Sequence, residues 1–300
     1  MDIIMVHGGV ESSTAPPYMK VLQEAAHSGA KALQSSVLDA AEEAVKVLEK
    51  SPLFNAGYGS ILNLDGQAEM DAAIIDGITG RFGAVAALRD ITNPISVARK
   101  VLEVTSHVLL AGEGAFKFAL SQGFQQENCI TPEMLKAWQK AVNLTDPEDL
   151  SEASLFTGMP IPTNCDTVGC VVSQQGKTAA ASSTGGSFLK LPGRVGDTPI
   201  IGGGIYASPR CAVVCTGLGE AFTETLTAKY VDSLLELGLH PEAAAKKAMI
   251  RLIQKKGVVG GLLVVDNTGR WGAAHNAQSF PVILMVNEKM AEDFQPVKIS

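Results

Sequence analysis

The stretch Thr163–Asp197 reads TNCDTVGCVVSQQGKTAAASSTGGSFLKLPGRVGD and contains the pattern that decides the fold. An apolar run at residues 168–172 precedes the polar turn Gln174–Lys177, and a run of small residues follows at 178–183. Two short strand-forming runs around a glycine-containing turn are typical of a β-hairpin. We therefore expect a hairpin near the middle of the chain, with a glycine-rich loop after it.

The register of this hairpin brings two threonines together. If Gln175 and Gly176 form the loop, counting outward places Thr167 opposite Thr184. Opposed residues project from the same face of a sheet a few ångströms apart, and threonine pairs of this kind are common sheet stabilisers. The pair alone therefore indicates a stable sheet, and a functional interpretation depends on the residues around it.

The residues that follow the hairpin indicate a site for a small charged ligand. Two glycines follow Thr184, and GRVGD at 193–197 supplies Arg194 and Asp197. A guanidinium can bind a carboxylate through two parallel hydrogen bonds, and an aspartate can accept from an ammonium group. Together the two side chains would suit the head group of an α-amino acid.

Six motifs, in this order along the chain, resemble those of the threonine-nucleophile asparaginases. This family of N-terminal nucleophile hydrolases comprises plant-type L-asparaginases, isoaspartyl peptidases and glycosylasparaginases. The resemblance runs from His7 to beyond Gly261. The motifs are FNAGYGS (54–60), EMDAAIIDG (69–77), DTVG (166–169), SSTGG (182–186), LPGRVGDTPIIGGGIYA (191–207) and TGLGE (216–220).

Composition is typical of a compact soluble enzyme. The chain has 300 residues, of which 46% are hydrophobic and 18% charged, with a net charge of −7. A large core is therefore possible, whereas a nucleic-acid partner would call for a basic face. We expect no membrane association, because no apolar run approaches the roughly 20 residues needed to cross a bilayer. The strand-like run at 2–6 is too short for a signal peptide, and five cysteines without framework spacing favour a cytoplasmic location.

The pattern before the hairpin predicts alternating helices and strands. A helix at 17–33 is followed by one that begins after Ser36, with Asp39 completing a capping-box-like start, and ends before Pro52. Asn93-Pro94 then predicts a capped start for a long helical stretch that ends at Gly123 and is interrupted near Gly112. Strands are expected at 68–76 and 84–88.

Residues 124–166 have a different character from the rest of the chain. They are polar and rich in proline, and they contain one short predicted helix at 133–142. A long connection without clear structure is unusual inside a compact domain. We interpret the segment as a flexible linker that becomes a free tail if the chain is cut behind it, with a plain surface loop as the alternative.

Beyond the hairpin, the pattern predicts a strand at 212–215, helices at 220–237 and 241–256, and a second hairpin formed by 261–265 and 271–275. The pattern alone allows an α+β or an α/β fold. The resemblance implies the α+β class and a four-layer αββα sandwich. It also implies that residues 1–300 form a single domain, which is cleaved into the chains 1–166 and 167–300.

The chemistry of a threonine nucleophile requires a base, because its hydroxyl is weakly nucleophilic. None of the motifs around Thr167 contains a histidine. A free α-amino group has a pKa of about 7.7–8.0, which suits a general base at neutral pH. Thr167 has such an amine only after the Asp166–Thr167 bond is cut. The resemblance implies that the chain cuts itself there and then hydrolyses L-asparagine or β-aspartyl peptides through a β-aspartyl ester of Thr167.

The resemblance also implies roles for the other site residues. Thr184 would orient the nucleophile, Asn55 would lie near it, and the Thr216 hydroxyl with the Gly217 N–H would form the oxyanion hole. Arg194 would hold the substrate α-carboxylate. The remaining substrate contacts are assigned to Asp197, Gly217 and Gly219, of which Asp197 and the Gly219 carbonyl would bind the α-ammonium group.

A structural sodium ion is the only bound ion that the resemblance implies, and no cofactor is expected for catalysis. The ion would be held by main-chain oxygens of one loop, and the partner would be a small-molecule substrate. The resemblance further implies a homodimer of cleaved αβ units. The residues of the sodium loop are Leu48, Glu49, Ser51, Phe54, Ala56 and Tyr58.

Two positions depart from the usual family pattern. His7-Gly8-Gly9-Val10-Glu11 stands where HGGAG is usual, and Asp166 stands before the nucleophile, where plant-type members usually have glycine. Asp166 is similar to the residue in glycosylasparaginases, archaeal asparaginases and taspases. Activity on N4-substituted asparagine, as in glycosylasparaginases, is therefore the alternative substrate prediction. That alternative would favour a secretory signal and disulfides, neither of which the sequence indicates.

Two other functional classes fit the sequence less well. The glycine runs at 202–204 and 217–219 do not complete a dinucleotide fingerprint, and no phosphate-binding loop motif occurs. The pairs Cys165/Cys170 and Cys211/Cys215 lack zinc-site spacing with nearby histidines, so buried small side chains are the better interpretation.

Overall fold

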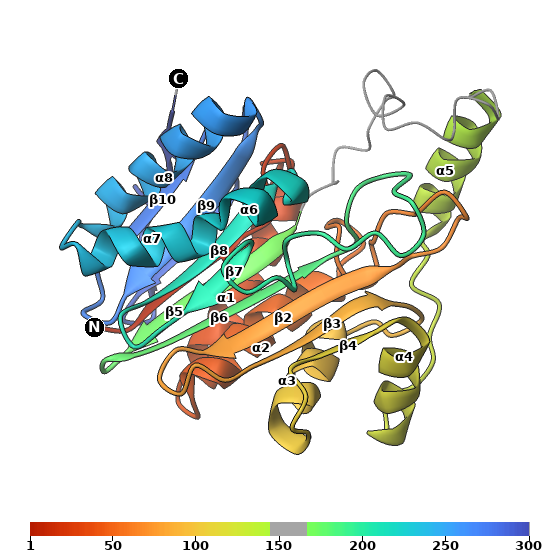
Figure 1. Cartoon of the computed structure of the whole chain (residues 1–300), viewed down its shortest axis with the longest axis horizontal. Coiled ribbons are helices and arrows are strands. Elements are labelled where there is room, and N and C mark those ends of the chain that lie inside the picture. Colours follow the sequence, from red (N-terminus) through yellow and green to blue (C-terminus); the bar gives the residue numbers. More distant parts are fainter. Residues whose placement is uncertain (145–166, 300) are drawn as a thin grey trace.

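The computed structural model describes residues 1–144 and 167–299 and has the mixed helix and strand content of an α+β fold (Figure 1). The predicted cleavage site at Asp166 and most of the irregular part of the predicted linker lie outside the described residues. The short helix predicted inside the linker is confirmed as α5, Pro132–Leu144.

The larger sheet contains eight strands and is built around the predicted hairpin. Its spatial order is β12-β11-β1-β5-β6-β2-β3-β4, and most neighbours are antiparallel. The strands are β1 (Ile3–His7), β2 (Met70–Asp76), β3 (Phe82–Leu88), β4 (Leu109–Ala111), β5 (Val168–Gln174), β6 (Lys177–Thr184), β11 (Val282–Val286) and β12 (Lys289–Met290).

The smaller sheet has five strands, all from the C-terminal half of the chain. Their spatial order is β13-β10-β9-β8-β7. The predicted second hairpin is confirmed in it as β9 and β10. The strands are β7 (Ile205–Ala207), β8 (Cys211–Gly217), β9 (Gly260–Asp266), β10 (Trp271–His275) and β13 (Val297–Lys298).

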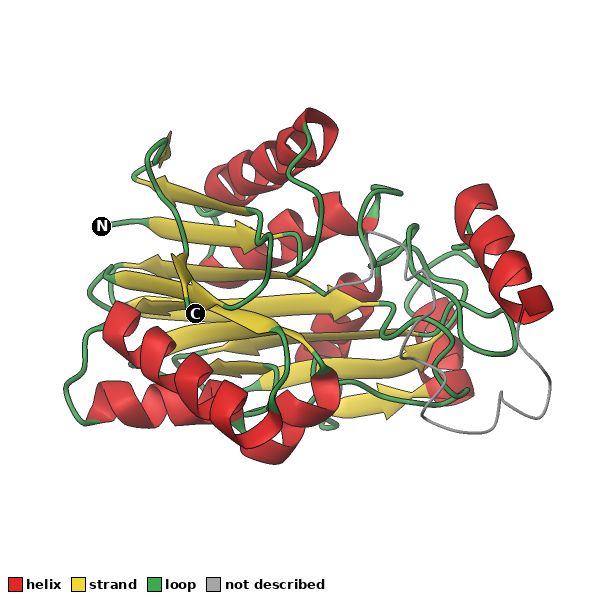
Figure 2. Ribbon diagram, turned by 90° about the horizontal axis from the view of Figure 1, so that it is seen from above, coloured by secondary structure: helices red, strands yellow, loops and turns green. Residues whose placement is uncertain are grey.

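The strands of both sheets lie in the middle of the molecule, and helices lie on the outer sides (Figure 2). Helices α1, α2 and α3 contact the larger sheet, and α7 and α8 contact the smaller one. Besides α5, the helices are α1 (Pro16–Ala32), α2 (Val37–Glu49), α3 (Pro94–Val104), α4 (Gly112–Ser121), α6 (Gly219–Thr225), α7 (Thr227–Glu236) and α8 (Pro241–Lys256).

Strand alternation explains the apolar clusters on the two faces of each sheet. Val171 packs in the cluster between the sheets, whereas Val172 packs in the cluster against helices α1 to α3. In the smaller sheet, Val214 belongs to the cluster between the sheets and Val213 to the cluster against α6 to α8. Because successive side chains point to opposite faces, strands covered on both sides are apolar throughout.

The predicted hairpin register is confirmed. Gln174 pairs with Lys177, and the ladder continues to the pair Val168 and Ser183. The two loop residues have positive φ angles, 49° at Gln175 and 81° at Gly176. Such angles are typical of the tight turn whose twist matches that of the flanking strands.

The predicted helical stretch to Gly123 is interrupted near Gly112, as expected, but α3 already ends at Val104. Asn93 occupies the N-cap position with Pro94 first in α3, as predicted, although the Asn93 side chain makes no capping hydrogen bond. The short edge strand β4 separates α3 from α4. The Asn93 side chain donates to Glu49 Oε2 at 3.2 Å, and the Ile95 N–H of α3 donates to Glu49 Oε1 at 2.9 Å. A buried carboxyl from the end of α2 therefore replaces the expected cap.

The predicted helix over 220–237 is divided into α6 and α7 at Leu226, which has a φ of 47°. The hydroxyls of Thr225 and Thr227 lie 2.6 Å apart beside this break. Apolar periodicity continues through the break, so the sequence pattern did not indicate it. The predicted start of α2 is confirmed, because the Asp39 N–H donates to Ser36 Oγ at 3.0 Å.

Candidate functional site

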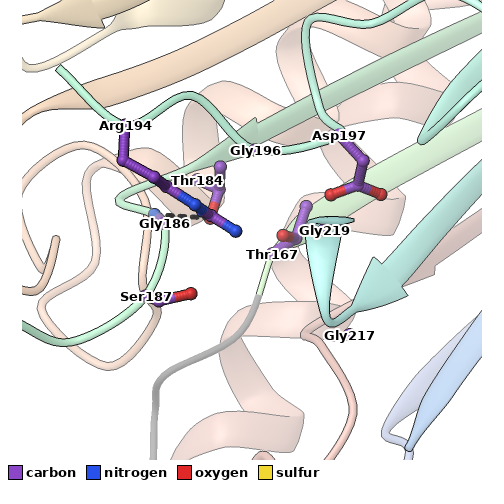
Figure 3. Close-up of a pocket in the computed structure, with 9 residues that line it drawn as sticks. All are labelled: Thr167, Thr184, Gly186, Ser187, Arg194, Gly196, Asp197, Gly217 and Gly219. Atoms are coloured by element: carbon purple, nitrogen blue, oxygen red, sulfur yellow. Dashed lines mark hydrogen bonds between the residues drawn. The ribbon is translucent and has the colours of Figure 1, made fainter. Parts of the chain in front are cut away.

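A small polar pocket lies at one end of the two sheets, beside Thr167, the residue that directly precedes β5 (Figure 3). Its cavity volume is about 30 Å³, far below the roughly 300–1,000 Å³ of pockets for drug-sized ligands. The pocket is therefore a narrow site for a small polar group. The lining residues are Thr167, Thr184, Gly186, Ser187, Arg194, Gly196, Asp197, Gly217 and Gly219.

Three threonines project into the space between the sheets at this end. Thr167, Thr184 and Thr216 share strand parity with Val171, Ala180 and Val214, respectively, all of which pack between the sheets. Their exposed fractions are 5%, 3% and 0%. Side-chain alternation therefore accounts for hydroxyls from three different strands meeting in one place.

The predicted meeting of Thr167 and Thr184 follows from the hairpin register. Val168 pairs with Ser183, so the next opposed pair outward is Thr167 and Thr184. Thr184 Oγ1 accepts the Gly186 N–H at 2.9 Å. This contact fixes the Thr184 hydroxyl at the start of the glycine loop, where both threonines line the pocket.

Strand β8 brings Gly217 into the pocket lining, while the predicted site residue Thr216 is fully buried just behind it. The Thr216 hydroxyl donates to the Thr167 carbonyl oxygen at 3.4 Å, which links the two sheets at the site. Gly217 has a φ of 135°, and a Cβ there would lie 2.6 Å from the Val259 carbonyl oxygen. The close approach of β8 to the segment before β9 therefore requires glycine.

Arg194 and Asp197 approach Thr167 from opposite sides of the pocket (Figure 3). A Cβ at Gly219 would lie 2.9 Å from Arg194 Nη2 and 3.0 Å from Asp197 Oδ1. Gly219 thus leaves room for both charged groups at the start of α6. A cation and an anion on either side of a hydroxyl form a dipolar site, as expected for an amino acid head group.

Glu220 is a pocket neighbour for which the sequence indicated no role. Arg194 donates from Nε and Nη2 to the two Glu220 carboxylate oxygens at 2.9 and 2.8 Å. Burial disfavours charge on both partners, but this paired contact raises the pKa of Arg194 and lowers that of Glu220. Both groups are therefore charged at neutral pH.

Two buried carboxylates beneath the pocket hold the loop that carries Arg194. Asp71 Oδ2 accepts the Gly196 N–H at 3.0 Å, and Glu69 Oε2 accepts the Gly193 N–H at 2.7 Å. Both acids belong to the EMDAAIIDG motif, but we assigned them no role from the sequence. Acidic residues at the start of an otherwise apolar strand were the available signal.

Lys190 is a buried cation beside the same loop. The Lys190 ammonium donates to the Glu69 carbonyl oxygen at 2.7 Å. Burial raises the pKa of Asp71 and lowers that of Lys190, and the attraction between the two charges opposes both shifts. Lys190 thus ties its own segment to the residue that holds the Gly193 N–H.

Asn55 lies behind the pocket wall rather than in it. Its Nδ2 donates to the Gly186 carbonyl oxygen at 2.8 Å, and its Oδ1 accepts the Ile61 N–H at 3.0 Å. Its own carbonyl oxygen accepts the Gly185 N–H at 3.0 Å. Asn55 thereby fixes the glycine loop that follows Thr184.

The loop predicted to hold sodium begins at the end of α2 and is tightly packed. A Cβ at Gly59 would lie 2.3 Å from the Phe54 carbonyl oxygen and 3.0 Å from that of Ser51. A Cβ at Gly57 would lie 2.3 Å from the Glu49 carbonyl oxygen. Both positions therefore require glycine, and the sodium ion stays a prediction.

Other classes of site receive no support from the described residues. Within residues 1–144 and 167–299, no three His, Cys, Asp or Glu side chains cluster as metal ligands would. No helix in the same ranges has the length and apolarity needed to cross a membrane. Cys170, Cys211 and Cys215 are buried and form no disulfide, as predicted for small core side chains, whereas Cys165 lies outside the described residues. Cys129 is also buried and free.

Comparison with known proteins gives one consistent result. A sequence profile of the family described as Asparaginase matches residues 1–294. A plant-type L-asparaginase from Thermococcus kodakarensis is 42% identical over 295 residues, covering 95% of this chain and 96% of that protein. An isoaspartyl peptidase from Salmonella typhimurium is 38% identical over 292 residues, covering 92% of each chain. An isoaspartyl peptidase/L-asparaginase from Mus musculus is 40% identical over 299 residues, covering 96% and 89%.

Proposed function

Since the chain belongs to the asparaginase family, we propose that it hydrolyses L-asparagine to L-aspartate and ammonia and also cleaves β-aspartyl dipeptides, with Thr167 as nucleophile. The relatives' names support a hydrolase acting on asparagine and on isoaspartyl bonds. The observation that carries the choice of nucleophile is the position of Thr167 between Arg194 and Asp197 in the pocket.

The pocket geometry supports recognition of the part that the two substrates share. Asparagine and a β-aspartyl dipeptide both present an α-carboxylate and an α-ammonium group next to a side-chain amide. The guanidinium of Arg194 binds the carboxylate, and Asp197 binds the ammonium group. The amide carbon then lies over Thr167, and its leaving group points to the open mouth of the pocket.

Maturation supplies the base. The Thr167 hydroxyl attacks the carbonyl carbon of Asp166, the peptide C–N bond breaks as an ester forms, and water hydrolyses the ester. This sequence leaves a carboxylate on residue 166 and a free α-amine on Thr167. The amine has a suitable pKa for removing the hydroxyl proton in each later turnover.

Turnover then repeats the same chemistry on the substrate. The Thr167 oxygen attacks the side-chain amide carbon, and the α-amine passes the proton to the leaving nitrogen, which departs as ammonia or an amino acid. Water hydrolyses the β-aspartyl ester and releases aspartate. The Thr216 hydroxyl and the Gly217 N–H stabilise the oxyanion, and a donor of this kind typically contributes about 3–4 kcal/mol to transition-state binding.

Further features implied by the family concern the layers of the fold, a bound ion and the assembly. We infer a four-layer αββα sandwich from the apolar clusters between the sheets and on their outer faces. The loop from Leu48 to Tyr58 would hold a sodium ion through main-chain oxygens, and its role would be structural. A homodimer of cleaved αβ units and a cytoplasmic location stay predictions.

Replacing Thr167 tests the proposal. Thr167→Ala should remain a single chain and should hydrolyse neither asparagine nor β-aspartyl dipeptides, because both reactions use the same hydroxyl. Thr167→Ser keeps a hydroxyl and should retain measurable cleavage and turnover. Full activity in Thr167→Ala would rule out Thr167 as the nucleophile.

A further inference from the structure

His7 is a buried histidine at the site with no assigned function. It is the last residue of β1, it is fully buried, and it shares strand parity with Ile3 and Met5, which pack between the sheets. In the register of the large sheet it pairs with Gly169, two residues after Thr167. Its side chain therefore enters the inter-sheet space beside the nucleophile.

The contacts of the imidazole determine which nitrogen carries the proton. Nδ1 accepts the Gly9 N–H at 3.2 Å, so Nδ1 is unprotonated and the proton of a neutral ring is on Nε2. Burial lowers the pKa of His7 to about 3, while the Thr167 backbone acts in the opposite direction. The ring is consequently neutral at neutral pH, with Nε2–H as a donor.

The surroundings place Nε2 against the start of β5, next to Thr167 along the chain. A Cβ at Gly169 would lie 2.5 Å from Nε2, so glycine leaves the space that this edge of the ring occupies. Nε2 is buried and has no partner at ordinary hydrogen-bond distance among the described residues. The ring lies 5.6 Å from that of Phe280, centroid to centroid. A buried N–H strongly favours an acceptor, and the Thr167 carbonyl is the backbone group that acts on it.

We propose that in the cut, active enzyme the His7 Nε2–H donates to the carbonyl of Thr167, which makes His7 a positioning residue for the nucleophile. A carbonyl oxygen can accept two hydrogen bonds, and the Thr216 hydroxyl approaches the same oxygen at 3.4 Å. The two donors come from different sheets. During turnover the single Thr216 hydroxyl proton is needed at the oxyanion, so the His7 Nε2–H is the donor that stays on the Thr167 carbonyl.

This anchor matters because of what the proposed maturation does to Thr167. Cleavage turns the residue into a chain end, and chain ends are mobile unless they are tied down. The hydroxyl and the α-amine must nevertheless stay aligned with the substrate amide. A donor on the one remaining peptide carbonyl supplies that restraint, whereas Arg194 and Asp197 are held by other elements.

The test compares three variants of the full chain after each has been purified and its cut fraction measured. His7→Phe fills the space without a donor, and His7→Gln retains an N–H donor. His275→Phe is the matched control, because His275 is also buried and packs on the same Phe280 ring at 5.5 Å. Rates are expressed per free Thr167 amine, and the thermal midpoint is recorded for every variant.

We expect cut His7→Phe to lose at least about tenfold in kcat, since misplacement of a reacting group by 1 Å can cost about a hundredfold. The KM for L-asparagine should stay unchanged, and His7→Gln should recover most of the rate. His275→Phe should retain the wild-type kcat. A normal kcat in cut His7→Phe, or equal losses in the Phe and Gln variants of His7, would overturn the proposal.

A second measurement applies even if His7→Phe does not fold. Nitrogen NMR of the wild-type enzyme should show His7 as the neutral Nε2–H tautomer at neutral pH. The Nδ1–H tautomer would overturn the inference. The inference rests on Thr167 being the nucleophile, so the activity of Thr167→Ala is measured alongside. An active Thr167→Ala would refute the proposed function. An inactive Thr167→Ala together with a wild-type kcat in His7→Phe would refute only the role of His7.

Discussion

At the scale of single residues, Glu220 decides which edge of Arg194 is available to a ligand. The carboxylate occupies Nε and one Nη2 hydrogen. Nη1 lies close to the lining glycines, 3.2 Å from a Cβ built on Gly186 and 3.0 Å from one built on Gly196. The end of the guanidinium therefore faces the pocket, while its side is held by Glu220.

Arg194→Lys should weaken substrate binding by about 1–3 kcal/mol, the range for a hydrogen bond to a charged group. Lysine keeps the charge but has no planar pair of donors, and it cannot bind Glu220 and a substrate carboxylate together in the same way. The KM should rise for L-asparagine and for a β-aspartyl dipeptide alike. Steady-state kinetics on the cut enzyme measure this.

Arg270→Lys is the matched control, because Arg270 pairs with Asp266 in the β9–β10 turn and does not line the pocket. It should leave KM unchanged. If cut Arg194→Lys also has the wild-type KM, Arg194 serves only to hold its loop and the carboxylate contact is wrong.

At the scale of elements, β2 fixes the substrate loop through Asp71. This fully buried carboxylate accepts the Ala87 N–H at 2.9 Å and the Gly196 N–H at 3.0 Å, one on each oxygen. The residue thus joins β3 to the loop that carries Arg194 and Asp197.

Asp71→Asn should raise KM and lower the thermal midpoint, because an amide has one acceptor oxygen and would leave one buried N–H facing its NH₂ group. An unsatisfied buried donor costs about 1–3 kcal/mol. Asp76→Asn is the matched control, because Asp76 lies at the far end of β2 and accepts the Ile78 N–H there. This variant should leave KM unaltered. Equal KM values in the two variants would contradict the role of Asp71.

The sequence predicted elements where one local signal dominated. The hairpin was predicted because Gln175-Gly176 and the strand-forming runs agree. The Ser36 cap was predicted because Ser36 and Asp39 have the three-residue spacing of a capping box. The end of α3 and the break at Leu226 were missed, since apolar periodicity continues past both. The short edge strands β12 and β13 consist of two residues each and give no periodic signal.

The candidate site was predictable to a similar degree. Thr167, Thr184, Arg194 and Asp197 lie close together in one stretch, and hairpin register with charge pairing was sufficient to group them. Glu69, Asp71 and Lys190 act through buried contacts between distant segments. His7 depends on the pairing of β1 with β5, which no local pattern reveals.

At the scale of the whole molecule, one buried acid makes stability depend on pH. Glu49 is fully buried, and burial raises its pKa from 4.5 to about 8, with the nearby Ser183 and the hydrogen bonds from Ile95 and Asn93 acting in the opposite direction. A raised folded-state pKa means that the folded protein retains a proton that the unfolded chain releases. The stabilisation of the folded state by this retained proton is complete below pH 4.5 and is lost as the pH rises to about 8.

Glu49→Gln should therefore gain stability relative to the wild type as pH rises through this window. The relative change is at most about 1.4 kcal/mol per pH unit, the value for one proton. Unfolding by urea at several pH values between 5 and 8.5 measures it. Glu43→Gln, on the half-exposed face of the same helix, is the control. A constant difference between Glu49→Gln and the wild type would show that Glu49 does not retain its proton.

The central claim joins these scales: Thr167 becomes the N-terminus of a second chain and acts with its own amine as base. Intact mass with N-terminal sequencing of the purified, active protein tests it most directly. We predict two chains, Met1–Asp166 and Thr167–Ser300, with threonine as the new first residue and activity proportional to the cut fraction. Full activity in a protein that remains one intact 300-residue chain would contradict the account.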